Sequence, residues 1–193
     1  MKRTETAKEA SNMRGYPVLS GVDRLHTVDD LLKGRRVGLM TNPTGIDHEL
    51  NSTIDLVHQR YHLTALFAVE HGIRGDAQAG AKVENTVDPA TGVTVYSAFG
   101  ANSHFNQEML DAFDVLVFDI QDVGARFYTY LYSLSYAMEA CARGGKEMVV
   151  LDRVNPLGGL KRTGTILDLR FSSFVGDYEL PTQYALTIGE YAR

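Results

Sequence analysis

The sequence predicts an α/β domain in which an open, mostly parallel sheet lies between two layers of helices. Short apolar runs alternate along the chain with segments of helical periodicity, a pattern typical of parallel strands joined by right-handed crossovers. The run at 114–121 is apolar almost throughout, as a strand covered on both faces should be. The helical pattern at 128–143 ends at Gly144 and Gly145, which suit a left-handed C-terminal cap.

The individual elements follow the same alternation. Strands are expected at 35–41, 63–70, 93–98, 114–121 and 147–153, where apolar runs end in turn residues or polar residues. Helices are expected at 52–58, where Ser52 can cap the first turn, at 107–113, at 128–143, and from about 186 onward. A glycine-containing loop at 71–92 separates two of the strands, and loops of that length usually serve a function or lack a fixed structure.

The composition is that of a globular protein and excludes several classes. Hydrophobic residues make up 44% of the 193 residues and charged residues 22%, which is close to the average for folded domains. The formal net charge of -5 and the lack of a basic run argue against a nucleic-acid partner. No apolar stretch reaches the length of a membrane span, and 1–20 contains no signal-peptide core, so the chain as it stands is expected in the cytoplasm.

Familiar cofactor and nucleophile motifs are missing from the sequence. There is no GxGxxG or GxxxxGK[ST] turn for a dinucleotide or phosphate, and no GxSxG serine elbow. The six histidines never form an HExxH array, so neither a metal site nor a cofactor is predicted. Cys141 is the single cysteine, which excludes an intrachain disulfide, and its apolar helical surroundings favour a core position over a nucleophile.

Polar residues gather where the predicted strands end. In open α/β sheets, ligands bind in the crevice beyond the carboxyl ends of the strands, so these residues are the candidates for a functional site. They are Thr41 and Asn42 after the first strand, Glu70 and His71 after the second, Asp119, Gln121 and Asp122 after the fourth, and Asp152, Arg153 and Asn155 after the fifth.

Glu70 is the leading candidate for a catalytic group. It leaves an apolar strand and enters the loop EHGIRG, where partial burial would raise the pKa of its carboxyl and make it a general acid. His71 and Arg74 can orient Glu70 or bind substrate. The alternative is that Glu70 and Arg74 form an ion pair that only stabilises the loop, with His71 as a structural hydrogen-bonding residue.

The segment DIQDVGARFYTY, 119–130, is the second candidate cluster. Asp119 or Asp122 can assist catalysis electrostatically, Arg126 offers a planar guanidinium for a carboxylate, and Tyr128 can stack on a sugar or hydrogen-bond to it. In the alternative interpretation Asp122 is a helix cap or an arginine partner and the tyrosines belong to the core. For Asp152 and Arg153, a structural pair is slightly favoured over a functional role.

Four blocks together resemble one known family. These blocks are RVGLMTNPTGID (36–47), LFAVEHGIRGDAQAGAKV (66–83), DVLVFDIQDVGARFYTYLYSLSYAMEA (114–140) and VVLDRVNPLGG (149–159). They resemble the exo-β-N-acetylmuramidase family, also called the NamZ or YbbC-like family and formerly a domain of unknown function. The resemblance runs from about Gly21 to the final residue.

The resemblance implies a Rossmann-like catalytic domain and a glycosidase activity. It predicts a flexible segment at 1–20, the Rossmann-like domain at 21–160, and a tail at 161–193 leading to a C-terminal domain outside this chain. Members of the family release N-acetylmuramic acid from the non-reducing ends of peptidoglycan fragments without a metal or nucleotide. If a leader had been removed, a place in the envelope or a secreted form would fit the family as well as recycling inside the cell.

The resemblance also suggests roles for the site residues. Glu70 in the EHG motif would be the acid/base catalyst, with His71, Asp119 and Asp122 in the same catalytic group. Arg74 or Arg126 would bind the lactyl carboxylate of N-acetylmuramic acid. Asn42 or Asn155 would contact hydroxyl or acetamido groups, and Gln121 and Tyr128 complete the predicted binding residues. A mechanism with two carboxyl groups and one in which the acetamido group attacks both stay open.

One stretch departs from the family pattern. Residues 181–190, PTQYALTIGE, have Tyr184 and Ala185 where many relatives are expected to have histidine and glycine, so substrate specificity can differ if this stretch lines the pocket. Two other functional classes remain open. The chain can be a sugar-binding module that retains the cleft without the reaction, or a transferase that uses the same crevice. Oligomeric state is not predicted.

Overall fold

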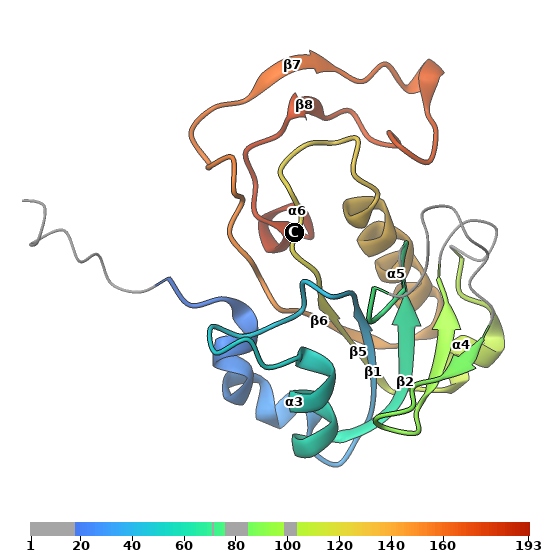
Figure 1. Ribbon diagram of the computed structural model, residues 1–193. Coiled ribbons are helices and arrows are strands. Elements are labelled where there is room, and N and C mark those ends of the chain that lie inside the picture. Colours follow the sequence, from blue (N-terminus) through green and yellow to red (C-terminus); the bar gives the residue numbers. More distant parts are fainter. Residues whose placement is uncertain (1–17, 71, 76–84, 99–103) are drawn as a thin grey trace, which may run out of the picture.

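A six-stranded sheet is the centre of the fold. The computed structural model describes residues 18–70, 72–75, 85–98 and 104–193, and within them the strand order is β3-β4-β2-β1-β5-β6 (Figure 1). All neighbouring strands are parallel except β3 and β4, which are antiparallel. The predicted α/β class, with a mostly parallel sheet between helical layers, is confirmed.

The strands are slightly shorter than the apolar runs that predicted them. The strands are β1 (Arg36–Thr41), β2 (His62–Ala68), β3 (Thr86–Val87), β4 (Thr94–Ser97), β5 (Val115–Asp119), β6 (Glu147–Val150), β7 (Thr163–Ile166) and β8 (Pro181–Gln183). The two-residue β3 lies within the predicted 71–92 loop, and β7 and β8 lie in the predicted tail. None of these three short strands was expected.

The helices agree with the predicted positions, with additions at 21–32 and at 169–171. They are η1 (Gly21–Val28), α2 (Asp29–Leu32), α3 (Thr53–Arg60), α4 (Gln107–Asp111), α5 (Tyr130–Gly144), η3 (Leu169–Phe171) and α6 (Ile188–Tyr191). Ser52 caps α3 as predicted, since its side chain accepts a hydrogen bond from the amide of Ile54. Gly145 follows α5 with φ 61°, the left-handed conformation expected of a C-terminal cap. The helical segment at 21–32 was not predicted.

One face of the sheet packs against the first helices of the chain. Val22 and Leu25 of η1, Leu32 of α2 and Ile54 and Val57 of α3 are buried together with apolar residues of the strands. These helical side chains recur three or four positions apart, so each short helix presents a single apolar stripe to the sheet. Burial of this stripe is what holds such short helices in place.

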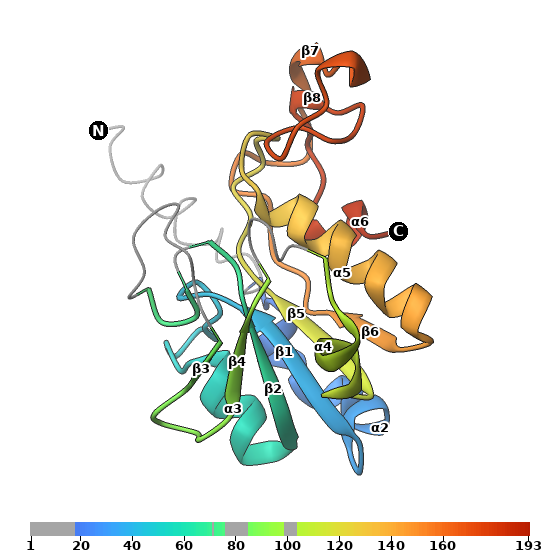
Figure 2. The same cartoon turned by 90° about the vertical axis from the view of Figure 1, so that its right-hand side faces the viewer.

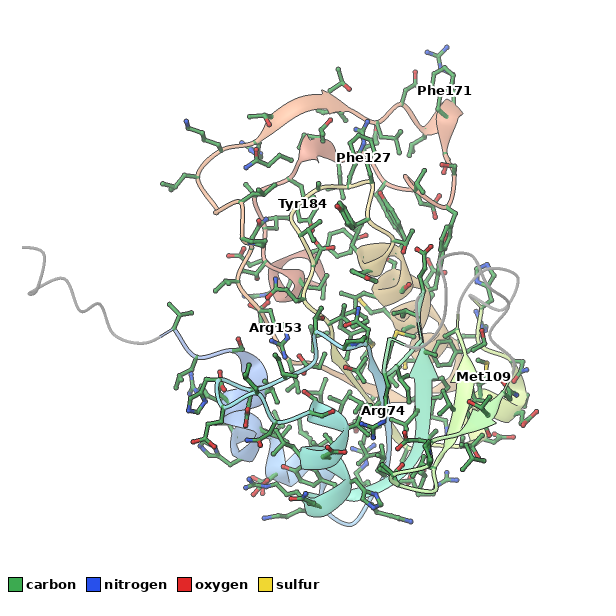
Figure 3. All side chains as sticks on the ribbon, in the orientation of Figure 1. Arg74, Met109, Phe127, Arg153, Phe171 and Tyr184 are labelled. Atoms are coloured by element: carbon green, nitrogen blue, oxygen red, sulfur yellow. The ribbon has the colours of Figure 1, made fainter. Side chains whose placement is uncertain are left out.

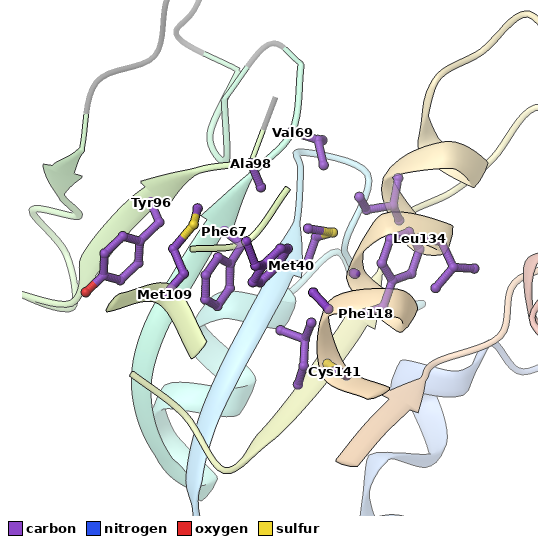
Figure 4. Packing of buried hydrophobic residues seen from close by; sticks show 14 of the residues in the cluster. Met40, Phe67, Val69, Tyr96, Ala98, Met109, Phe118, Leu134 and Cys141 are labelled. Atoms are coloured by element: carbon purple, nitrogen blue, oxygen red, sulfur yellow. The ribbon is translucent and has the colours of Figure 1, made fainter. Parts of the chain in front are cut away.

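The opposite face packs against α4, α5 and α6. Phe67 of β2 and Phe118 of β5 lie in this second core with Met109 of α4 and Leu134 of α5 (Figure 4). Ile188 of α6 is buried in the same cluster, which ties the end of the chain to the sheet. Cys141 of α5 is buried here as a core residue. The helices on both faces complete the three layers.

The carboxyl ends of the three central strands are level with one another. Thr41 at the end of β1 lies opposite Ala68 of β2 on one side and Asp119 of β5 on the other. The side chain of Thr41 donates a hydrogen bond to the carbonyl oxygen of Asp119 over 2.7 Å. The segments that follow β1, β2 and β5 therefore leave the sheet at one edge, as the crevice rule requires.

A two-stranded arm stands above this edge of the sheet. Residues 163–183 contain β7, η3 and β8, and we refer to them as the arm. Within the arm, β7 pairs antiparallel with β8. In both views the arm lies beyond the end of the sheet toward which the arrow of β2 points (Figures 1 and 2). In the described part of the chain, none of the helices has the length and apolar character needed to cross a membrane.

Candidate active site

Glu70 lies at the edge where the central strands end. It lies two residues after the end of β2, is partly buried, and its Oε2 accepts a hydrogen bond from the Oγ1 of Thr129 over 3.4 Å. Thr129 is buried and stands immediately before α5, so the loop after β2 and the loop after β5 meet at this contact. Glu70 is therefore partly buried against the loop after β5 rather than fully turned into solvent. His71 lies outside the described residues.

Several predicted site residues influence the pKa of Tyr130. Burial raises the pKa of Tyr130, the side chain of Asn42 opposes this rise through a hydrogen bond, and the negative charges of Glu70 and Asp122 raise the pKa further. Three predicted site residues, from the loops after β1, β2 and β5, are thus close enough to one phenol to influence it. Tyr128 adds a weaker effect of the same sign.

Asp122 is the most unusual carboxyl of this group. It is 5% exposed, and its Oδ2 accepts hydrogen bonds from the amide of Gly124 over 2.7 Å and from the phenol of Tyr184. Its buried Oδ1 has no hydrogen-bond partner within the part of the chain that the structure describes. Burial raises the pKa of Asp122 to about 6, although the Gly124 amide favours the charged form. The alternative interpretation of Asp122 as a helix cap or arginine partner is wrong.

Asp119 has a different environment from the one that its predicted catalytic role requires. It is fully buried, and its two carboxylate oxygens accept hydrogen bonds from Arg153 over 2.7 and 2.9 Å, with a further bond from the hydroxyl of Thr53. Burial raises the pKa of Asp119, and Arg153 opposes that rise. No surface of Asp119 is open to a substrate, so its charge serves to hold α3 and the loop after β6 together.

The expected side-chain pairing of Asp152 with Arg153 is wrong. Arg153 pairs with Asp119, whereas the carboxylate of Asp152 accepts hydrogen bonds from the hydroxyl of Thr187 over 2.9 Å and from the amide of Gly189 over 2.7 Å. Asp152 therefore anchors the start of α6. Successive side chains point to opposite sides of an extended segment, which explains why these neighbours have separate partners.

Arg74 is held by aspartates, and the ion pair with Glu70 that the alternative interpretation required is not formed. Its Nε and Nη2 donate to the two carboxylate oxygens of Asp88 over 2.6 and 3.0 Å, and Nη2 also approaches Asp55 at 3.4 Å. Asp88 is buried and receives a further bond from the hydroxyl of Thr91. In this arrangement the fork of Arg74 fixes the loop after β2 rather than facing a free acceptor.

Arg126 anchors the arm. It is buried, and its Nη1 donates to the carbonyl oxygens of Thr165 and Leu180 over 2.6 and 2.7 Å. Its own carbonyl oxygen accepts a hydrogen bond from the phenol of Tyr132 in α5. The guanidinium expected to bind a substrate carboxylate therefore joins β7 and β8 to the loop after β5.

The predicted amide residues bind neighbouring loops. Asn155 donates to the carbonyl oxygen of Leu186 over 2.9 Å, and Gln121 donates to the carbonyl oxygens of Asp122 and Val154 over 2.6 and 2.8 Å. These bonds fix the loops around the crevice to one another. Asn42 differs, because its Oδ1 accepts from Thr44 while its side chain also reaches Tyr130.

The structure thus divides the predicted residues into two groups. Asn42, Glu70, Asp122 and Tyr128 all influence the pKa of Tyr130, Asn42 through a hydrogen bond and the other three through their charges. The others that it describes take part in hydrogen bonds that hold the loops, and they are Arg74, Asp119, Gln121, Arg126 and Asn155. Thr129 and Tyr130 were not singled out from the sequence, because they read as the start of a helix. Tyr184 was noted, but its contact with Asp122, 62 positions away, was not predicted.

A large open hollow lies beneath the arm rather than at Glu70. Its volume is about 820 Å³, and Leu160, Ile166 and Leu180 are among its lining residues. Tyr184 lines the hollow and also donates to Asp122, so it links the two places (Figure 3). The polar chemistry lies at the strand ends, and we therefore place the candidate site there. The described residues contain no cluster of histidine, cysteine and acidic side chains that could hold a metal ion.

Comparisons with known proteins identify the family of the chain. The model of the family described as exo-beta-N-acetylmuramidase NamZ, N-terminal, matches residues 37–193. The peptidoglycan beta-N-acetylmuramidase NamZ of Bacillus subtilis (strain 168) is 47% identical over 192 residues, which are 98% of this chain and 45% of that protein.

Two crystal structures from Bacteroides fragilis NCTC 9343 share the fold. Both are described as DUF1343 family proteins. The first has a TM-score of 0.83 and 45% sequence identity, and the match covers 44% of its length. The second has a TM-score of 0.78 and 32% sequence identity, and the match covers 45% of its length. Each comparison covers 90% of this chain. The chain therefore spans less than half the length of the relatives that it matches.

Proposed function

This chain belongs to the NamZ exo-β-N-acetylmuramidase family, and from that membership we propose that it is the part of a glycoside hydrolase that carries the catalytic acid. The proposed reaction releases N-acetylmuramic acid from the non-reducing end of peptidoglycan fragments. Its partners are muramyl sugars, and the proposal needs no cofactor. The observation that carries it is the position of Glu70, at the end of β2, beside Thr129 and close to the same phenol as Asp122.

Glu70 is proposed to act first as a general acid and then as a general base. The protonated carboxyl of Glu70 donates its proton to the glycosidic oxygen as the bond from that oxygen to the anomeric carbon breaks. The carboxylate of Glu70 then takes a proton from the water that adds to the anomeric carbon, which returns the enzyme to its starting state. The hydroxyl of Thr129 supports the carboxylate in this second step, because it donates a hydrogen bond to Oε2.

Asp122 is proposed to stabilise the positive charge that develops on the sugar. Its pKa of about 6 keeps it ionised at neutral pH, and the buried, unpaired Oδ1 is the oxygen whose charge the described residues leave uncompensated. A carboxylate in a poorly solvated site interacts more strongly with a nearby positive charge than one in water. Asn42 is proposed to bind a hydroxyl or acetamido group at the same edge.

Replacing Glu70 with Gln tests the assignment. Glu70→Gln preserves the shape of the side chain and removes the transferable proton, so the release of N-acetylmuramic acid from the disaccharide should fall by about 100-fold or more. The matched control is Glu108→Gln, the same change at an exposed glutamate of α4. The thermal unfolding midpoints of both variants should stay close to that of the unmodified protein.

The outcomes separate the proposed enzyme from a sugar-binding module. Full activity in Glu70→Gln would show that another residue supplies the proton. Binding of the disaccharide without any product from the unmodified protein would show that the cleft retains the ligand but lacks the reaction. Transfer of the sugar to added alcohols in place of water would instead indicate a transferase.

A further inference from the structure

Two consecutive aromatic residues stand at the rim of the candidate site. Phe127 and Tyr128 are 53% and 51% exposed, and they directly precede Thr129, whose hydroxyl donates to Glu70. Tyr128 has a hydroxyl that water can solvate, whereas the ring of Phe127 has no polar atom. An exposed phenylalanine two positions before the residue that contacts Glu70 therefore leaves apolar surface in water where a ligand can be bound.

The ring of Phe127 is held in a fixed place. The guanidinium carbon of Arg126 lies over it, 5.4 Å from the ring centroid, so one face of the ring is occupied by a cation. Arg126 is itself fixed, because its side chain donates to Thr165 and Leu180 and its amide donates to the carbonyl oxygen of Thr182 over 3.0 Å. Figure 3 shows Phe127 between the arm and α5.

The exposed fraction differs sharply between residues of the site. Asn42 and Asp122 are 4% and 5% exposed, whereas Phe127 is more than half exposed. An enzyme that removes the terminal sugar of a chain must enclose that sugar and leave the rest of the chain in the open. The buried polar residues suit the enclosed sugar, and the exposed ring suits the sugar that follows it.

We propose that Phe127, together with Tyr128, forms a stacking platform for the sugar on the leaving-group side of the bond that is cleaved. The C–H groups on one face of a pyranose ring form an apolar surface that packs on an aromatic ring. Because Arg126 fixes the ring of Phe127, little side-chain entropy is lost when the sugar binds. The inference rests on the proposed function, since it names the part of the same substrate that lies beyond Glu70.

Sugar binding to a protein that cannot turn over tests the platform directly. In the Glu70→Gln background, we would measure by calorimetry the binding of N-acetylmuramic acid alone and of its β-linked disaccharide with N-acetylglucosamine. Phe127→Ala should weaken disaccharide binding by about five- to tenfold, the size expected of one aromatic contact, and leave monosaccharide binding unchanged. Phe127→Tyr keeps the flat ring and should restore disaccharide binding.

Phe171→Ala is the matched control. Phe171 is 72% exposed and lies in η3 of the arm, so its removal deletes a similar amount of exposed aromatic surface elsewhere. It should change neither affinity. In protein with Glu70 intact, Phe127→Ala should lower kcat/KM for the disaccharide by the same factor and leave hydrolysis of muramyl fluoride, which has no second sugar, unchanged.

Three results would overturn the platform. One is equal disaccharide affinity with and without the Phe127 ring, and another is an equal loss for both sugars, which would place the ring against the terminal sugar. The third is an effect of Phe171→Ala as large as that of Phe127→Ala. Each of these leaves the test of Glu70 standing, because the loss of turnover in Glu70→Gln does not depend on Phe127.

Discussion

The phenol of Tyr184 donates a hydrogen bond to Oδ2 of Asp122, so a residue that follows β8 completes a carboxyl site formed after β5. The amide of Gly124 is the other donor to the same oxygen. Both Asp122 and Tyr184 are buried, and the second carboxylate oxygen of Asp122 is unpaired among the described residues. The protein therefore keeps a costly group in place in the loop after β5, which is common where a side chain serves function rather than stability.

Asp122→Asn should raise stability at neutral pH. Burial raises the pKa of Asp122 from 3.8 to about 6, so the folded protein binds this proton more tightly than the unfolded chain. The free energy of unfolding contributed by Asp122 is therefore largest below pH 4 and falls as the pH rises toward 6. Since asparagine does not ionise, the variant should be more stable by about 1–3 kcal/mol at pH 7.5 and by much less at pH 4. Urea unfolding at the two pH values measures this difference.

Activity should change in the opposite direction to stability. If Asp122 stabilises positive charge on the sugar, Asp122→Asn should hydrolyse the disaccharide at least about tenfold more slowly at pH 7.5. Tyr184→Phe is the control, since it removes the hydrogen bond and retains the carboxyl, and it should lower stability instead of raising it. If the gain in stability of Asp122→Asn over the unmodified protein were the same at both pH values, the raised pKa would be contradicted.

Arg153→Met should be strongly destabilising. The side chain of Arg153 is the charged partner of Asp119, and its loss leaves a fully buried carboxylate whose remaining side-chain donor is Thr53. Breaking a buried ion pair from one side costs about 3–5 kcal/mol, which urea unfolding would detect. The double variant Asp119→Asn with Arg153→Met should recover at least half of the loss, because the unpaired charge is gone. No recovery would mean that the packing of Arg153 matters more than its charge.

Ala185→Gly should stabilise the protein. Ala185 has φ 57°, a left-handed conformation that is unfavourable for residues with a Cβ atom, and glycine adopts it without strain. Relief of that strain should exceed the greater flexibility of glycine in the unfolded chain, for a net gain of up to about 1 kcal/mol. A rise in the thermal unfolding midpoint would show the gain. Ala185→Val, with a branched side chain, should lower the midpoint, and similar midpoints for both variants would contradict the strain.

The central strands of the sheet were predictable because they are buried on both faces. Val115–Asp119 is entirely buried and correspondingly apolar in sequence, so the strand is visible without any knowledge of its neighbours. β7 is the opposite case, since all of Thr163–Ile166 is exposed and no apolar pattern marks it. Its position depends on the anchoring of Arg126 to Thr165, 39 positions away, and a sequence pattern does not show such a contact.

The rule for strand ends selected candidates for the site but did not assign their roles. It grouped Asn42, Glu70 and Asp122 in one region, and all three influence the pKa of Tyr130. It did not distinguish residues that face the crevice from residues that hold the loops, because Asp119 and Asp122 differ only in which partner they meet. Those partners are Arg153 and Tyr184, which lie 34 and 62 positions further along the chain. The expected histidine and glycine at 184 and 185 were informative, since position 185 has the conformation that glycine favours.

Asp152 connects the first and last elements of the core. The amide of Gly21 at the start of η1 donates to its carbonyl oxygen over 2.7 Å, while its carboxylate accepts from Thr187 and Gly189 at the start of α6. Helices as short as η1 and α6 would fray independently if each were held only by its own hydrogen bonds. Because they share this attachment, the two should open and close as one cooperative unit, and their amide protons should exchange with solvent at related rates.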